Sequence, residues 1–252
     1  MKKYILLLGS VFLLVGCSEF NQPISSEREG IWNQMIVWPI VSIIQILAEF
    51  TGSYAGGIIL VTVLVKICIL PLTLKQIKSS RDMQTLQPQL QALRKTYSSR
   101  DAETQQRYQQ EMMKLMQSTG VNPIAGCLPV LIQMPILIGL YHGISRMNVT
   151  PMYELGSIFN VPLATSSIIF AMIAGGMQYL VLKTGPTLNT NPQMSIVQYI
   201  LPVMIMIFGF MAPTAITLYW IVSSFISILQ NIYLYKILYR KEEDMSLISE
   251  NK

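Results

Sequence analysis

Long apolar runs alternate with short polar segments along most of this chain. Five of the runs are each close to the roughly 20 residues that an α-helix needs to cross a bilayer. Residues 211–213, Met-Ala-Pro, separate the last two runs and predict a tight turn at one face of the membrane. The pattern therefore predicts an all-α membrane protein with five transmembrane helices. The expected helices cover residues 57–76, 124–145, 164–183, 195–212 and 214–236.

Residues 31–50 are also apolar, but their pattern differs from that of the five runs. Gln45 and Glu49 interrupt the apolar positions, and Trp32 and Trp38 lie near the start of the segment. Tryptophan is enriched where a membrane meets water, and an amphipathic helix at that boundary lies in the plane of the interface. We therefore expect an extracytoplasmic interfacial helix here, with a further transmembrane helix as the alternative.

The polar segment 77–121 is too long to be a simple turn. Two stripes of apolar residues recur at helical spacing on either side of residues 98–101, Ser-Ser-Arg-Asp, where Asp101 is a candidate N-cap. This pattern predicts a helical hairpin with thin apolar faces, which would be loosely packed and mobile. A passive connector is the alternative. The stripes are Leu86, Leu90, Leu93 and Tyr97, then Tyr108, Met112, Leu115 and Met116.

Composition and charge support a membrane protein and indicate its orientation. The 252 residues are 52% hydrophobic and 12% charged, with a mean hydropathy of +0.45. Cytoplasmic loops of membrane proteins are enriched in Lys and Arg. These residues concentrate around 75–114 and in a basic tail, 237–252, whereas the opposite side carries Arg28 and Arg146. The hairpin and the C-terminus should therefore be cytoplasmic and the N-terminus outside.

The first 16 residues have the features of a bacterial lipoprotein signal peptide. Lys2 and Lys3 precede an apolar stretch over residues 4–15, and residues 14–17, Leu-Val-Gly-Cys, have the form of a lipobox. We expect lipid attachment at Cys17, so that residues 17–56 form a lipidated N-terminus and the interfacial helix on the outer face of a bacterial plasma membrane. The alternative is an ordinary secretory signal that contains a cysteine by chance.

Lys66 is an unexpected charge in the middle of the first predicted transmembrane helix. A cation there costs about 2.5–3.5 kcal/mol on insertion scales, and the predicted helices contain no Asp or Glu that could neutralise it. From the centre of the bilayer the amino group would have to reach about 15 Å to water, whereas a lysine reaches about 6 Å. The residue therefore predicts local water inside the membrane and an acidic group brought by a substrate.

Other polar side chains are expected at the same depth on other helices. Thr62 and Thr73 share a face with Lys66, because they are offset from it by four and seven residues. Hydrogen bonding between helices, worth about 0.6 kcal/mol each on average, is the alternative for any one of them. Together with Lys66 they predict a hydrophilic groove. Its further residues are Gln133, Gln178, Thr217, Tyr219, Trp220 and Ser223, next to Ser224 and Ser227.

The sequence offers no recognisable catalytic or metal-binding motif. The chain contains a single histidine, His142, which we read as interfacial, and no phosphate-binding loop or metal-ligand cluster. Cys68 and Cys127 are read as apolar packing residues. We therefore expect neither an enzyme nor a bound cofactor.

Three stretches resemble the YidC family of membrane protein insertases, in its Gram-positive lipoprotein form. They are Asn122 to Leu137 (NPIAGCLPVLIQMPIL), Leu70 to Gln76 (LPLTLKQ) and Leu218 to Ser224 (LYWIVSS). The resemblance covers about 31–240. It implies a five-helix bundle whose hydrophilic groove opens to the cytoplasm and to lipid but is closed outside. Lys66 stands where members of the family usually have arginine.

The resemblance implies an insertase that moves hydrophobic segments of nascent membrane proteins into the plasma membrane without nucleotide hydrolysis. The partners implied are nascent membrane proteins, the ribosome and membrane lipids, with no nucleic-acid substrate. The sequence leaves open whether the protein works beside the Sec translocon. A transporter or channel and an assembly scaffold without insertase activity are the alternatives.

Overall fold

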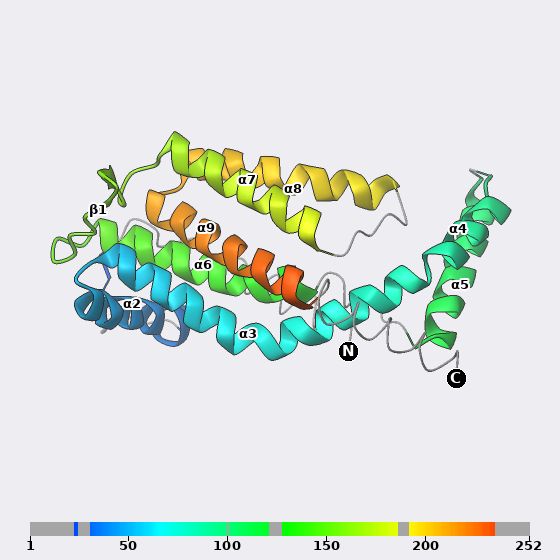
Figure 1. Ribbon diagram of the computed structural model, residues 1–252, viewed down its shortest axis with the longest axis horizontal. Helices are drawn as coiled ribbons and strands as arrows, with labels where there is room; N and C mark the ends of the chain where they lie inside the picture. Colours follow the sequence, from blue (N-terminus) through cyan, green and yellow to red (C-terminus); the bar gives the residue numbers. More distant parts are fainter. Residues whose placement is uncertain (1–22, 25–30, 100, 121–127, 186–191, 235–252) are drawn as a thin grey trace. The chain divides into compact units, whose positions relative to one another are not determined.

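The computed structural model describes residues 23–24, 31–99, 101–120, 128–185 and 192–234, which are mainly helical (Figure 1). A short π-helix, η1 (Asn33–Val37), leads into α2 (Trp38–Thr51). The described residues form two compact units. The first unit consists of the described residues within Met1–Val65, Ile132–Ala174 and Ile205–Ser223. The second consists of those within Lys66–Leu131, Gly175–Met204 and Ser224–Lys252. The remaining helices are α3 (Tyr54–Thr85), α4 (Gln87–Thr96), α5 (Ala102–Ser118), α6 (Leu128–Asn148), α7 (Ile168–Thr184), α8 (Pro192–Met211) and α9 (Thr214–Asn231).

In the first unit, α2 packs closely against α3 and α6. Gly139 and Gly143 are one turn apart on α6, and a Cβ at either position would lie within 3 Å of the side chains of Ile36, Ile40 or Val41. Small residues at this spacing let two helices approach within a membrane. Gly57 plays the same part on α3, where a Cβ would lie 2.7 Å from a backbone oxygen of α2. The close packing buries one face that runs from the end of η1 along α2, made of Val37, Val41, Ile44 and Ala48.

The connection between α6 and α7 contains the only departure from helix among the elements of the described residues. Strands β1 (Ser157–Ile158) and β2 (Val161–Pro162) pair antiparallel, with Ile158 opposite Val161. The expectation of a purely helical chain is corrected here. Phe159 and Asn160 adopt positive φ angles of 49° and 63°, which is the backbone of a two-residue hairpin turn.

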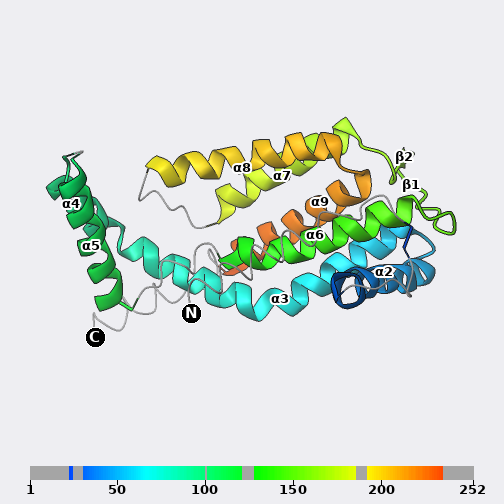
Figure 2. The same ribbon diagram turned by 180° about the vertical axis from the view of Figure 1, so that it is seen from behind.

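In the second unit, α4 and α5 form the expected helical hairpin (Figures 1 and 2). Its small apolar core buries Leu86, Leu90 and Met116, and Met83, Met112 and Leu115 pack against them. The prediction that this hairpin is mobile stays a prediction. The helix α3 continues without interruption beyond the expected end of the first span, at residue 76, as far as Thr85.

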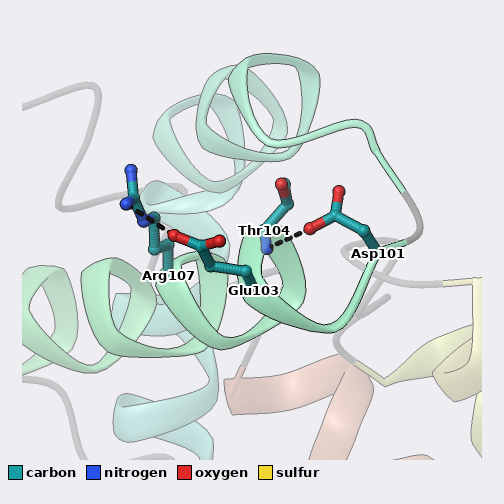
Figure 3. Close-up of polar contacts among 4 residues, drawn as sticks. All are labelled: Asp101, Glu103, Thr104 and Arg107. Atoms are coloured by element: carbon teal, nitrogen blue, oxygen red, sulfur yellow. Dashed lines mark hydrogen bonds and ion pairs between the residues drawn. The ribbon is translucent and has the colours of Figure 1, made fainter.

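Asp101 caps α5, as the sequence predicts (Figure 3). Its carboxylate accepts a hydrogen bond from the Thr104 amide at 2.8 Å, and one turn of the helix is further linked by an ion pair of 2.7 Å between Arg107 and Glu103. Hydrogen bonds from the Ser99 hydroxyl and then from the Thr104 amide hold the pKa of Asp101 at about 2. The N-terminus of α5, at the turn of the hairpin, is therefore stabilised.

Within the described residues, three helices are long and apolar enough to cross a membrane. They are Asn33–Thr51, Tyr54–Thr85 and Thr214–Leu234. Two shorter apolar helices, Ile168–Thr184 and Tyr199–Met211, lie in the third and fourth expected spans. The number of five spans and the interfacial position of residues 31–50 stay predictions.

Candidate functional site

Lys66 lies on α3, partly buried, in the second unit. Its Nζ donates a hydrogen bond of 2.9 Å to Oγ of Ser227 on α9. In the described part of the chain, the ion pairs join Arg107 to Glu103 and Lys114 to Glu111, and none joins Lys66 to a carboxylate. The charge is therefore bonded to a neutral hydroxyl, and the ammonium keeps further N–H donors for an acidic group of another molecule.

A second contact of the same unit joins α7 to α9. The Ser224 hydroxyl donates to Oε1 of Gln178 at 3.3 Å. Further along both helices, Nδ2 of Asn231 donates to the carbonyl of Val181 at 3.2 Å and lies 3.4 Å from Oγ1 of Thr184. Polar groups therefore link these two otherwise apolar helices at more than one level.

In the first unit, the structure brings together two other predicted site residues. Nε2 of Gln133 on α6 donates to the hydroxyl of Tyr219 on α9, and Tyr219 is only 2% exposed. Trp220, the next residue, makes an edge-on contact with Phe208 of α8 at 5.5 Å between ring centroids. The amide and the phenol thus form a neutral polar pair inside an apolar core.

The predicted threonines make local hydrogen bonds instead. The buried hydroxyls of Thr62 and Thr217 donate to the carbonyls of Ile58 and Thr214 in their own helices, at 2.6 and 2.9 Å. Ser223 is buried on α9. Cys17 lies outside the described residues. The structure therefore pairs Lys66, Gln133 and Gln178 with residues of α9, whereas the two threonines bond within their own helices.

Ser227, the partner of Lys66, is not singled out by the sequence, although it lies among the serines expected next to the groove. Tyr219, Ser223 and Ser227 recur every four residues, and that spacing places them on one face of α9. The spacing could have singled out Ser227. The contact itself joins residues 161 positions apart, and local periodicity carries no information about such a pairing.

Arg146 follows the expected second span, residues 124–145, in the sequence, but it is part of α6 and is only 1% exposed. Its guanidinium donates to Oδ1 of Asn33 at 2.8 Å and to the carbonyl of Pro23 at 3.4 Å. Next to it, the Thr150 hydroxyl accepts from the amide of Ile24 at 2.8 Å. His142, expected at an interface, is also buried on α6, edge-on to Trp32. These residues fasten the segment before η1 to α6.

Fold and site together define a class: a helical membrane protein that holds polar pairs and a cation within apolar helices. A model of the family described as 60Kd inner membrane protein matches residues 46–242. The chain is 42% identical to Membrane protein insertase YidC 1 of Halalkalibacterium halodurans, over 91% of this chain and 88% of that protein. It is 41% identical to Membrane protein insertase MisCA of Bacillus subtilis, over 89% and 87% of the two chains.

A solved structure gives the same result. It is described as an active YidC insertase crystal structure with the first transmembrane domain resolved, and it matches with a TM-score of 0.64 and 25% identity. The match covers 82% of this chain and 48% of that chain, so this protein spans about half the length of the solved one. The chain belongs to the 60Kd inner membrane protein family.

Proposed function

We propose that this protein is a membrane protein insertase that moves hydrophobic segments of nascent proteins into the plasma membrane through a hydrophilic groove, without nucleotide hydrolysis. One observation carries the proposal. Lys66, a cation within an apolar helix, is hydrogen-bonded to the neutral hydroxyl of Ser227. The names of the relatives agree with this function.

Lys66 supplies the attraction for the client. Two unit charges about 4 Å apart attract each other by about 4 kcal/mol at an effective dielectric constant of about 20. An acidic residue in the client's short extracytoplasmic segment would join Ser227 as a partner of Lys66, because an ammonium has three N–H donors. The client carboxylate is thereby stabilised part of the way across the membrane, where it would otherwise be costly.

The neutral polar pairs are proposed to bind the client's backbone. Gln178 with Ser224, and Gln133 with Tyr219, each hold a side-chain hydrogen bond that a client amide or carbonyl could exchange with little net loss. Thr62, Thr217, Trp220 and Ser223 remain proposed members of the groove. The supporting observation is that three of the polar partners, Tyr219, Ser224 and Ser227, come from α9.

Transfer of the client helix into lipid is proposed to complete the reaction. Phe225 and Leu229 are one turn apart on α9 and both are exposed, so they offer an apolar surface to a passing helix. Burial of apolar client surface is favourable by about 25 cal/mol per Å². The membrane potential adds about 2.3 kcal/mol per charge per 100 mV for an acidic segment that moves outward.

The proposed topology has five transmembrane helices and an extracytoplasmic interfacial helix. The N-terminus is outside and lipid-anchored at Cys17, and the hairpin and the basic tail are cytoplasmic. The hairpin would receive the nascent chain, the tail would contact the ribosome, and lipids would surround the bundle. Cooperation with the Sec translocon is not required by this scheme.

Reconstitution tests the function directly. Purified full-length protein in vesicles of phosphatidylethanolamine and phosphatidylglycerol should insert a single-span client with an acidic N-terminal tail, measured as protease protection of that tail. Empty vesicles are the control, and equal protection in both would refute insertase activity. Depletion in cells distinguishes an insertase from an assembly scaffold. Loss of an insertase leaves client helices uninserted, whereas loss of a scaffold leaves them inserted but unassembled. A channel would instead release a trapped ion from the same vesicles.

A further inference from the structure

The turn between β1 and β2 places an aromatic side chain in an unfavourable backbone conformation. Two-residue hairpin turns with positive φ at both positions favour Asn-Gly or similar pairs. Asn160 suits its position, but Phe159, at a φ of 49°, does not, because a Cβ crowds the backbone there. The first position of the turn therefore holds a residue that the fold itself does not favour.

No packing within the described first unit offsets this cost. Phe159 is 87% exposed, which makes it more exposed than any other large apolar residue of the described chain. Met152, in the same connection, is 73% exposed. Large apolar side chains presented in this way mark a surface that meets something apolar outside the chain.

The hairpin cannot fold back to bury Phe159, because its base is fixed. The amide of Leu163 donates to the carbonyl of Gly156 at 3.0 Å, which closes the hairpin, and the Leu163 side chain is fully buried. The start of α9 holds the same segment, through the amide of Ala215 to the Leu163 carbonyl at 3.1 Å and that of Thr214 to the Thr165 carbonyl at 2.7 Å. The tip is therefore presented outward on a rigid support.

The surroundings indicate a lipid surface. Glu154 is the only charged residue between positions 149 and 167, and the hairpin itself, 157–162, is uncharged. Ile168 and Ile169, the first residues of α7, are also exposed, at 68% and 64%. A connection between two transmembrane helices begins and ends at the membrane boundary, where aromatic side chains that pack among the lipids are enriched.

We propose that Phe159 is a membrane anchor: it inserts into the leaflet next to the α6–α7 connection and holds the hairpin, and through it the start of α9, against the bilayer. The partner is the lipid itself. The anchor needs α6 and α7 to cross the membrane, as in the proposed topology, but it does not need insertase activity. Its test therefore fails or succeeds separately from that of the proposed function.

Photocrosslinking tests the anchor. Phe159 is replaced by p-benzoylphenylalanine in the full-length protein, which is reconstituted without any client in vesicles of phosphatidylethanolamine and phosphatidylglycerol, and irradiated. Glu154, which is exposed in the same connection, is the matched control position. We expect a phospholipid adduct by mass spectrometry at position 159, several-fold more abundant than at position 154.

Three results would overturn the proposal. Equal or absent lipid adducts at the two positions would show that the tip is in water. A protein adduct of one constant mass at position 159, formed in cells at the expense of the lipid adduct, would show that the tip contacts a protein.

A Phe159→Gly variant, whose glycine suits the turn, checks that the hairpin forms without the aromatic side chain: unchanged limited proteolysis of residues 149–167 is expected. Rapid cleavage there would show that Phe159 is needed for the fold, and this too would count against an anchoring role.

Discussion

Two cations within apolar helices, Arg146 and Lys66, are held in contrasting ways. Arg146 is almost completely buried and donates to two acceptors of its own chain, Asn33 and Pro23. Lys66 is only partly buried and donates to a serine hydroxyl. The planar guanidinium is suited to several fixed acceptors, whereas an ammonium is a compact charge on a flexible stem. We infer that Arg146 fastens the fold and that Lys66 is available to a client.

The largest expected effect comes from removing the charge at Lys66. Lys66→Ala should lower insertion of a client with an acidic tail at least about tenfold, because an attraction of a few kcal/mol is lost. Lys66→Arg should keep most activity. The measurement is protease protection in reconstituted vesicles. A client whose acidic residues are replaced by Asn and Gln is the control, since the alanine variant should insert it as the unchanged protein does. If Lys66→Ala inserts the acidic client normally, the electrostatic part of the scheme is wrong.

Arg146→Met should act on stability instead. The variant leaves the buried Oδ1 of Asn33 and the carbonyl of Pro23 without this donor, which should cost about 3 kcal/mol. Thermal unfolding in detergent should show a lower midpoint, with an intermediate value for Arg146→Lys, which keeps the charge but not the fork. The preference for acidic over neutral clients should be unchanged in protein that remains folded. If the unfolding midpoint equals that of the unchanged protein, Arg146 does not stabilise the fold.

Ser227→Ala examines the hydroxyl that positions Lys66. A net hydrogen bond is worth about 1 kcal/mol, so insertion of an acidic client should fall about fivefold or less. Ser227→Thr should restore most of the activity, because it keeps a hydroxyl. The neutral client separates positioning from folding: a loss that is equal for both clients would mean that Ser227 only supports the helix packing.

The smallest effect is expected at an exposed charge, Asp101. Its folded pKa of about 2 lies below the ordinary value of 3.8, so its contribution to the cap is present above about pH 4 and disappears as the pH falls toward 2. Asp101→Ala should speed hydrogen exchange of the Thr104 amide several-fold at neutral pH, as measured by NMR or mass spectrometry. Asp101→Asn, which keeps an acceptor, should change it little. Unaltered exchange in the alanine variant would show that the cap contributes nothing.

Much of the fold could be predicted from the sequence, because helices and their ends are encoded locally. The periodic leucines of the hairpin and Asp101 at its turn are examples, and the structure confirms both. Lys66 was also identifiable, because a charge in an apolar run is visible without knowledge of any contact. The length of the apolar run was enough to place Lys66 in a transmembrane helix. The polar residues of α9 were likewise visible as a cluster in the sequence.

What could not be predicted depends on contacts between distant segments. Arg146 has the sequence context of a loop end, and its burial depends on a partner, Asn33, that lies 113 positions away. The turn at Phe159 was missed because phenylalanine is not a residue that predicts positive φ. The packing role of Gly139 and Gly143 depends on α2 lying across them, which local periodicity does not encode.

The continuity of α3 has a consequence for the hairpin that follows it. From Lys66 to Thr85 the chain remains helical, so about 28 Å of helix lies between the cation and the hairpin. Each residue of a helix rotates the chain by about 100° and advances it by about 1.5 Å. The length of this segment therefore sets both the direction in which the hairpin points and its distance from Lys66 along the helix. Inserting four residues would nearly restore that direction, whereas inserting two would turn the hairpin to the opposite side.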